Sequence, residues 1–129
     1  MRYALLVLCL ASPALAEAPL TAEAFDALTQ GQTMTWSEFG RVYGVEQYLP
    51  NRRVRWTVLG DVCKLGLWYP EGDLICFQYE NDLEPDCWTI TQGSDGLDAR
   101  YVGTSVDSSP VVVQKTTEPM ACFGPEVGA

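Results

Sequence analysis

Four cysteines are the residues of this chain whose types and spacing most directly predict chemistry. Cys63, Cys76, Cys87 and Cys122 are separated by 12, 10 and 34 intervening residues. A four-cysteine zinc site usually takes its ligands in closely spaced pairs, and this spacing lacks such pairs. The fifth cysteine, Cys9, lies in the N-terminal segment that we expect to be removed on export, as argued below. The four that are left are an even number, which in an exported chain predicts two disulfides, with zinc as the alternative.

The absence of histidine restricts the reactions that this chain can catalyse. It removes the usual general base at neutral pH, the Ser-His and Cys-His nucleophile pairs, and the commonest metal ligand. Two carboxylates can still carry out hydrolysis, and the chain has 17 acidic residues, but no motif singles out a pair. We therefore assign no catalytic residue, no cofactor and no metal, and keep a carboxylate-dependent hydrolase as an alternative function.

The charge of the chain also excludes some partners. Its formal net charge is −9, which disfavours binding to nucleic acid phosphates or to anionic lipid. Residues 80–86 contain four carboxylates, a composition that suits a hard cation such as calcium. The glycine and the spacing of acids typical of a calcium loop are missing, so we interpret this segment as a solvated hairpin tip.

Candidate contact residues come from a basic spot and from the aromatic side chains. Arg53 and Arg55 lie two apart, so in a strand they share one face and could bind a carboxylate or a phosphate. Pairing with acids of neighbouring strands, or plain solvent exposure, is the alternative. Tyr43 and Tyr48, beside predicted turns, are expected near an opening or a partner surface. Nine aromatic residues could line a pocket or simply fill the core: Trp36, Tyr43, Tyr48, Trp56, Trp68, Tyr69, Phe77, Tyr79 and Trp88.

The N-terminus has the pattern of a secretory signal peptide. Arg2 precedes an apolar run, and small residues at 14 and 16 predict cleavage after Ala16. The run is too short to cross a membrane. Lipidation at Cys9 is the alternative, which Leu8 disfavours. We expect residues 1–16 to be removed, and residues 17–129 to form one disulfide-stabilised β-rich domain in the periplasm or outside the cell.

The elements that position these residues are one short helix followed by strands. Thr21 is a good N-cap and Gly31 a good helix end, which predicts a helix over residues 22–30. Beyond it, apolar and β-branched runs alternate with turn residues. They predict strands at 33–36, 45–49, 54–59, 64–69, 74–79, 87–92, 97–102 and 111–115. The fold class is therefore mainly β: an antiparallel meander of six to eight strands, either a curled sheet or a small lipocalin-like barrel.

Hairpin geometry favours one pairing of the four cysteines. A turn centred between Asn81 and Asp82 places Cys76 opposite Cys87, at the separation that a cross-strand disulfide requires. The remaining pair is then Cys63–Cys122, which would tie the C-terminal segment to the sheet.

Several of these segments resemble a family of small exported bacterial proteins of unknown function. That family has an N-terminal helix, a G-x-W strand and a paired-cysteine hairpin. The matching residues are 20–25, Gly31-Gln32-Thr33, Gly66-Leu67-Trp68, Leu74-Ile75-Cys76-Phe77 and Cys87-Trp88. The resemblance implies a curled antiparallel sheet and lends no catalytic residue. We expect a binding module for an exported protein partner or a small apolar ligand, or a structural envelope protein without a site.

Overall fold

The computed structural model describes residues 9–10 and 18–123. The predicted cleavage position after Ala16 lies outside these residues. Within the described part of the chain, no helix has the length and apolar character needed to span a membrane.

The N-terminal helix forms as its capping residues predict. Helix α1 (Ala22–Thr29) begins after Thr21, whose hydroxyl oxygen accepts a hydrogen bond from the Ala24 amide at 3.2 Å. Gly31 follows the helix with a φ of 77° and its amide donates to the Tyr48 carbonyl at 2.9 Å. The helix is thereby joined directly to the sheet, which an eight-residue helix needs in order to be stable.

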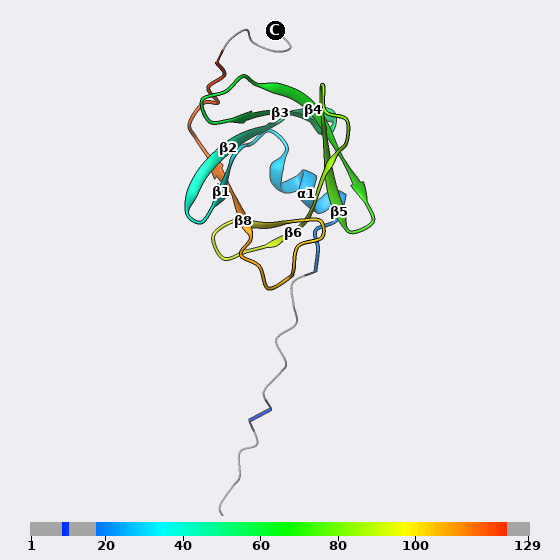
Figure 1. The fold of residues 1–129 in the computed structure, drawn as a ribbon. Coiled ribbons are helices and arrows are strands. Elements are labelled where there is room, and N and C mark those ends of the chain that lie inside the picture. Colours follow the sequence, from blue (N-terminus) through cyan, green and yellow to red (C-terminus); the bar gives the residue numbers. More distant parts are fainter. Residues whose placement is uncertain (1–8, 11–17, 124–129) are drawn as a thin grey trace, which may run out of the picture.

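Eight antiparallel strands close into a barrel in which every strand pairs with its neighbours in sequence (Figure 1). The first strand also pairs with the last, from Thr33 opposite Thr116 to Ser37 opposite Val112. The mainly-β prediction is confirmed, and the structure is the barrel form. The strands are β1 (Thr33–Glu38), β2 (Arg41–Tyr48), β3 (Arg53–Val58), β4 (Lys64–Glu71), β5 (Leu74–Tyr79), β6 (Asp86–Gln92), β7 (Leu97–Tyr101) and β8 (Val111–Thr116), with a 3₁₀ turn η1 (Pro50–Arg52) before β3.

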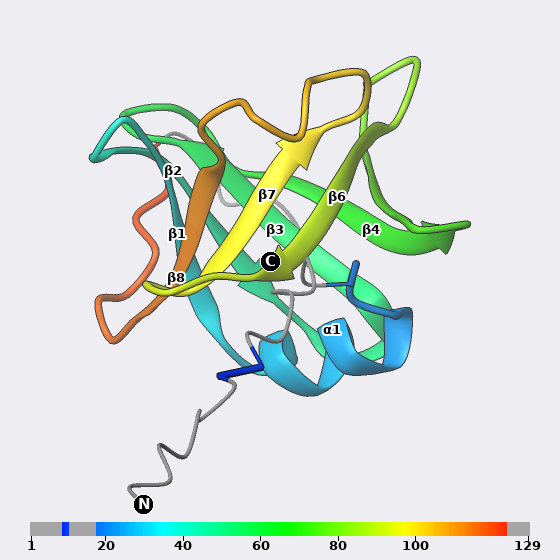
Figure 2. The same cartoon turned by 90° about the horizontal axis from the view of Figure 1, so that it is seen from below.

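The two ends of the barrel differ. Helix α1 lies at one end, and the loops after β5 and β7 lie at the other, which we call the open end (Figure 2). Phe25 of the helix is fully buried and meets the rings of Tyr48 and Trp68 edge-on, at centroid distances of 5.7 and 5.0 Å. The Leu20 amide, just before the helix, donates to the Ile90 carbonyl at 2.7 Å. Side chains and backbone together close this end of the barrel, which we call the helix end.

Strand β2 begins four residues earlier than the sequence pattern indicates. It starts at Arg41, directly after a tight turn at Phe39 and Gly40 with φ values of 49° and 77°. Two successive positive φ angles match the right-handed twist of a hairpin. Glycine is typical of this conformation and phenylalanine is not, so only Gly40 indicates the turn in the sequence.

Both expected disulfides are present, Cys76–Cys87 and Cys63–Cys122. Cys76 and Cys87 are direct partners in the β5–β6 register, as the hairpin geometry predicts. Two disulfides indicate an oxidising compartment outside the cytoplasm. The second disulfide holds the C-terminal segment against the outside of the barrel, where the Phe123 amide donates to the Asp61 carbonyl at 3.2 Å.

Candidate functional site

An aromatic cavity of about 210 Å³ lies inside the open half of the barrel. Its wall consists of six aromatic side chains and one carboxylate, contributed by five strands. The lining residues are Trp36, Tyr43, Trp56, Phe77, Tyr79, Asp86 and Trp88. Pockets that hold drug-sized molecules measure about 300–1,000 Å³, so this cavity suits a smaller molecule.

Most neighbouring rings of this cavity meet at steep angles, whereas Phe77 and Tyr79 are stacked with an angle of 6° between their planes. Trp36 lies at 83° to Trp56 and at 64° to Trp88, with centroid distances of 6.0 and 5.2 Å. Phe77 stands at 87° to Trp36. Edge-to-face contacts of this kind stabilise an aromatic cluster beyond the burial of its area. The cavity is therefore held open by ring packing.

A β-bulge brings Tyr43 into the cavity wall. In the β1–β2 register, Trp36 pairs with Gly44 and Ser37 pairs with Val42, so Tyr43 is the extra residue between them. A bulge re-aims a side chain that strict alternation would place on the outer face. No signal in the sequence identifies this bulge.

Two glycines make room for wall residues. A Cβ atom on Gly44 would collide with the indole of Trp56. A Cβ atom on Gly66 would lie 2.7 Å from both the Gln78 carbonyl oxygen and Tyr79 Cδ1. Real Cβ atoms do not approach neighbours this closely. The rings of Trp56 and Tyr79 can therefore occupy their positions only because Gly44 and Gly66 have no side chain.

Substituting Gly44 with alanine should displace Trp56 and lower the free energy of unfolding by about 1–3 kcal/mol, the usual cost of overpacking. Urea unfolding followed by circular dichroism measures the loss. In a Trp56→Leu background the same substitution should cost much less, because the colliding ring is gone. Equal costs in the two backgrounds would contradict the assigned contact.

A buried acid supports the cavity wall from within the barrel. The Tyr79 hydroxyl donates to Glu46 Oε1 at 2.7 Å, and Glu46 has no exposed surface. Glu46 Oε2 is buried and has no hydrogen-bond partner among the described residues. Glu46 does not line the cavity, so it acts on the cavity only by holding the Tyr79 ring in the wall.

The titrating groups around the cavity have shifted pKa values. Burial raises the pKa of the Glu46 carboxyl well above its usual 4.5, although the hydrogen bond from Tyr79 opposes the shift. Burial, together with the smaller effects of the charges of Glu38, Glu46 and Asp86, raises the pKa of Tyr43 to about 12. Burial and the charge of Glu46 likewise raise the pKa of Tyr79. The tyrosines therefore stay neutral at physiological pH.

The raised pKa of Glu46 predicts that stability falls as the pH rises above about 4.5. Over that range the folded protein keeps a proton that the unfolded chain has lost, which lowers the free energy of unfolding by about 1.4 kcal/mol per pH unit until Glu46 ionises. Glu46→Gln should flatten this fall, and the control Glu118→Gln, at an exposed acid, should not. Urea unfolding at pH 4 to 8 measures how the free energy of unfolding depends on pH in each protein. A fall of unchanged slope in Glu46→Gln would refute this assignment.

An outer hollow of about 460 Å³ adjoins the aromatic cavity at the open end. Tyr43 and Trp88 line both spaces. The outer hollow is bounded by residues of the β7–β8 loop, where Arg100 Nε donates to the Ser108 carbonyl at 3.2 Å. Tyr43 and Trp88 therefore stand between the cavity and the exterior.

The four expected contact residues do not come together. Arg53 and Arg55 lie on the outer face of β3, and the alternation places Val54 and Trp56 inside. Tyr48, expected near an opening, is 1% exposed, because helix α1 covers that end of the barrel. Only Tyr43 lines the cavity. Neither arginine forms an ion pair with a described residue.

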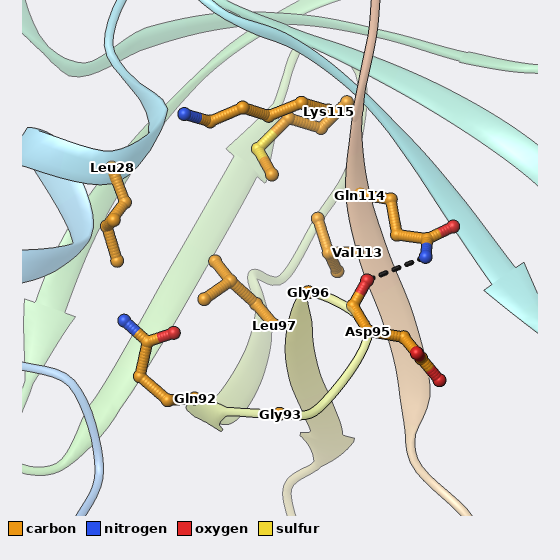
Figure 3. Close-up of a pocket in the computed structure, with 10 residues that line it drawn as sticks. Leu28, Gln92, Gly93, Asp95, Gly96, Leu97, Val113, Gln114 and Lys115 are labelled. Carbon is orange, nitrogen blue, oxygen red and sulfur yellow. Dashed lines mark hydrogen bonds between the residues drawn. The ribbon is translucent and has the colours of Figure 1, made fainter.

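A second groove, of about 500 Å³, lies at the helix end (Figure 3). Leu28 of α1 faces Leu97 and Val113 across it, and Gln114 Nε2 donates to the Asp95 carbonyl at 2.6 Å. None of the unpaired buried polar atoms belongs to its lining residues. This groove has no aromatic wall, and its polar lining residues are Gln92, Asp95, Gln114 and Lys115.

One group of potential metal ligands occurs in the described residues: Glu71, Cys76 and Cys87. Both sulfurs are joined to each other in the disulfide, so neither is a thiolate that could bind a metal. This group therefore offers no metal centre.

Comparisons with known protein families, curated proteins and solved structures found no match to this chain. The resemblance to small exported bacterial proteins stays a prediction.

Proposed function

We propose that this protein binds a small molecule in the aromatic cavity of the barrel, in the periplasm or outside the cell after removal of residues 1–16. The single observation that carries this proposal is the cavity itself: six aromatic walls and the Asp86 carboxylate enclose a space at the open end. Few convergent polar groups in a largely apolar cavity are typical of small-ligand sites. The two disulfides support the proposed location.

The alternatives account for less of this geometry. Hydrolysis by two carboxylates requires that both reach the same bond of the substrate. Asp86 lines the cavity, but Glu46 is fully buried and does not line it. A protein partner at the arginines would meet the outer face of β3 and leave the aromatic cavity without a role.

The experiment compares the mature protein, purified from the cells that produce it, by native and denaturing mass spectrometry. We expect a small-molecule adduct that is lost on denaturation. A Trp56→Leu variant should lose the adduct, because Trp56 forms one wall of the cavity. The matched control is Trp68→Leu, since Trp68 is buried beside Phe25 and does not line the cavity.

Nuclear magnetic resonance supplies the second readout for this proposal. The chain has four tryptophans, and three of them line the cavity. Adding the isolated ligand should shift the indole N–H signals of Trp36, Trp56 and Trp88 and leave that of Trp68 unchanged. A bare protein mass from every preparation, or shifts confined to residues outside the cavity, would refute the proposal.

A further inference from the structure

We propose that the ligand of the aromatic cavity is a small organic cation, an alkylammonium or quaternary ammonium compound. This inference rests on the proposed binding function and specifies the chemical class of the ligand. Three features of the open end support it: the π surfaces of the cavity, the sign of the charges that face it, and the scarcity of oxygen ligands.

The walls of the cavity suit a cation with alkyl substituents. Each aromatic face carries a partial negative charge from its π electrons and attracts a cation within about 6 Å, tryptophan most strongly. Three of the six aromatic walls are tryptophans, and Trp36 lies at steep angles to both Trp56 and Trp88. Such a cavity surrounds an alkylammonium group with π faces on several sides, while its methyl groups pack against the rings.

The charged group that lines the cavity has the sign that a cation requires. Asp86 is the only charged residue in the described lining, and the Tyr101 hydroxyl donates to its Oδ1 at 3.4 Å. Arg100 is the base that lines the outer hollow, and its Nε donates to the Ser108 carbonyl. An anionic ligand in the cavity would therefore meet a carboxylate and π faces with no cation to balance it.

The open end as a whole is acidic. The strand ends and loops there, at residues 38–41, 58–64, 79–86 and 100–111, contain seven acids and three bases. One of the bases, Lys64, is paired with Asp82 at 3.2 Å. A surface of one charge sign around an entrance raises the local concentration of counter-ions and their rate of association. This field favours cations over neutral or anionic ligands.

An inorganic cation fits the cavity poorly. Calcium takes six to eight oxygen ligands, and magnesium needs a near-ideal octahedron of oxygens. The cavity lining offers oxygen ligands from Asp86 and from the hydroxyls of Tyr43 and Tyr79 only. An organic ammonium ion needs no such shell, because aromatic faces replace its weak hydration.

The test compares choline with 3,3-dimethylbutan-1-ol, in which a carbon atom replaces the charged nitrogen. Both are titrated into the disulfide-intact mature protein, and the indole N–H signals of Trp36, Trp56 and Trp88 report binding, with Trp68 as the internal control. Tetramethylammonium serves as a second cationic probe. We expect choline to bind at least about tenfold more tightly than the neutral alcohol, because several rings contribute to cation–π attraction.

Substitution of Asp86 separates the charge at the cavity from the general charge of the open end. Asp86→Asn should weaken choline binding at least about tenfold and leave binding of the alcohol unchanged, because only the cation loses a charge partner. Glu84→Gln makes the same change in charge at an exposed residue of the same loop that does not line the cavity. At 0.15 M salt it should weaken choline binding by less than about twofold.

Three results would overturn this inference. Equal or tighter binding of the neutral alcohol would show an apolar site, and the proposed binding function would stand. Choline shifts confined to residues outside the cavity would place the cation elsewhere. No shift at 10 mM choline or tetramethylammonium, with a native circular dichroism spectrum, would exclude small ammonium ligands, and the adduct experiment would still decide the proposed function by itself.

Discussion

Replacing Phe25 with alanine should lower the free energy of unfolding by about 3–5 kcal/mol, the usual cost of deleting a buried phenylalanine ring. The ring is fully buried, and it contacts Tyr48, Trp68 and Phe77 edge-on at centroid distances of 5.7, 5.0 and 6.3 Å. Its removal leaves a cavity among rigid aromatic rings, which cannot close around the gap. Urea unfolding followed by circular dichroism gives the change.

Leu28 provides the matched control for this substitution. It belongs to the same helix but is only partly buried, at the groove beside the β6–β7 hairpin. Leu28→Ala should cost less than half as much as Phe25→Ala, because a partly exposed side chain loses less burial. Equal losses would show that the substitutions act by weakening the helix and not by removing the Phe25 ring from the core.

Removing the Cys63–Cys122 disulfide, by alanine at both positions, should lower the free energy of unfolding by about 4 kcal/mol. The two cysteines are 59 residues apart, so the bond removes much of the freedom of the unfolded chain. The loss also frees the C-terminal segment, which shares a hollow on the outside of the barrel with Thr57 of β3. Chemical unfolding of the oxidised proteins measures the difference.

The Cys76–Cys87 disulfide supplies the comparison for Cys63–Cys122. Cys76 and Cys87 are 11 residues apart, and the same reasoning gives about 3 kcal/mol for removing their bond. Removing the Cys63–Cys122 bond should therefore lower the free energy of unfolding more than removing the Cys76–Cys87 bond. The reverse order, with the variant lacking the Cys76–Cys87 bond less stable than the one lacking Cys63–Cys122, would show that local packing outweighs chain entropy in this barrel.

Local signals in the sequence were sufficient for most of the fold. Thr21 and Gly31 predict the helix to within one residue, and the turn between Asn81 and Asp82 predicts the observed register of Cys76 with Cys87. The sequence does not distinguish a curled sheet from a barrel. The difference depends on the contact of β1 with β8, strands that are far apart in the sequence, and no local pattern encodes such a contact.

The candidate site was less accessible to sequence reasoning. The sequence identifies the aromatic residues as possible pocket walls, but it does not predict the burial of Glu46, because an acid in a strand ordinarily faces solvent. Tyr43 reaches the cavity through a bulge, and Tyr48 is covered by the helix. Both placements result from tertiary packing, so the alternation of residues along β2 could not distinguish them.

Closure of the barrel also bears on how the chain avoids aggregation. Seven of the eight strand pairings join sequence neighbours, and only β1 with β8 joins the two ends of the sheet. Loop-closure entropy delays such long-range contacts, so we expect this seam to form last. Until it forms, β1 and β8 are unpaired edges that another chain can extend. The vulnerable state of this protein is therefore an opened sheet late in folding, and the native barrel has no edge to offer.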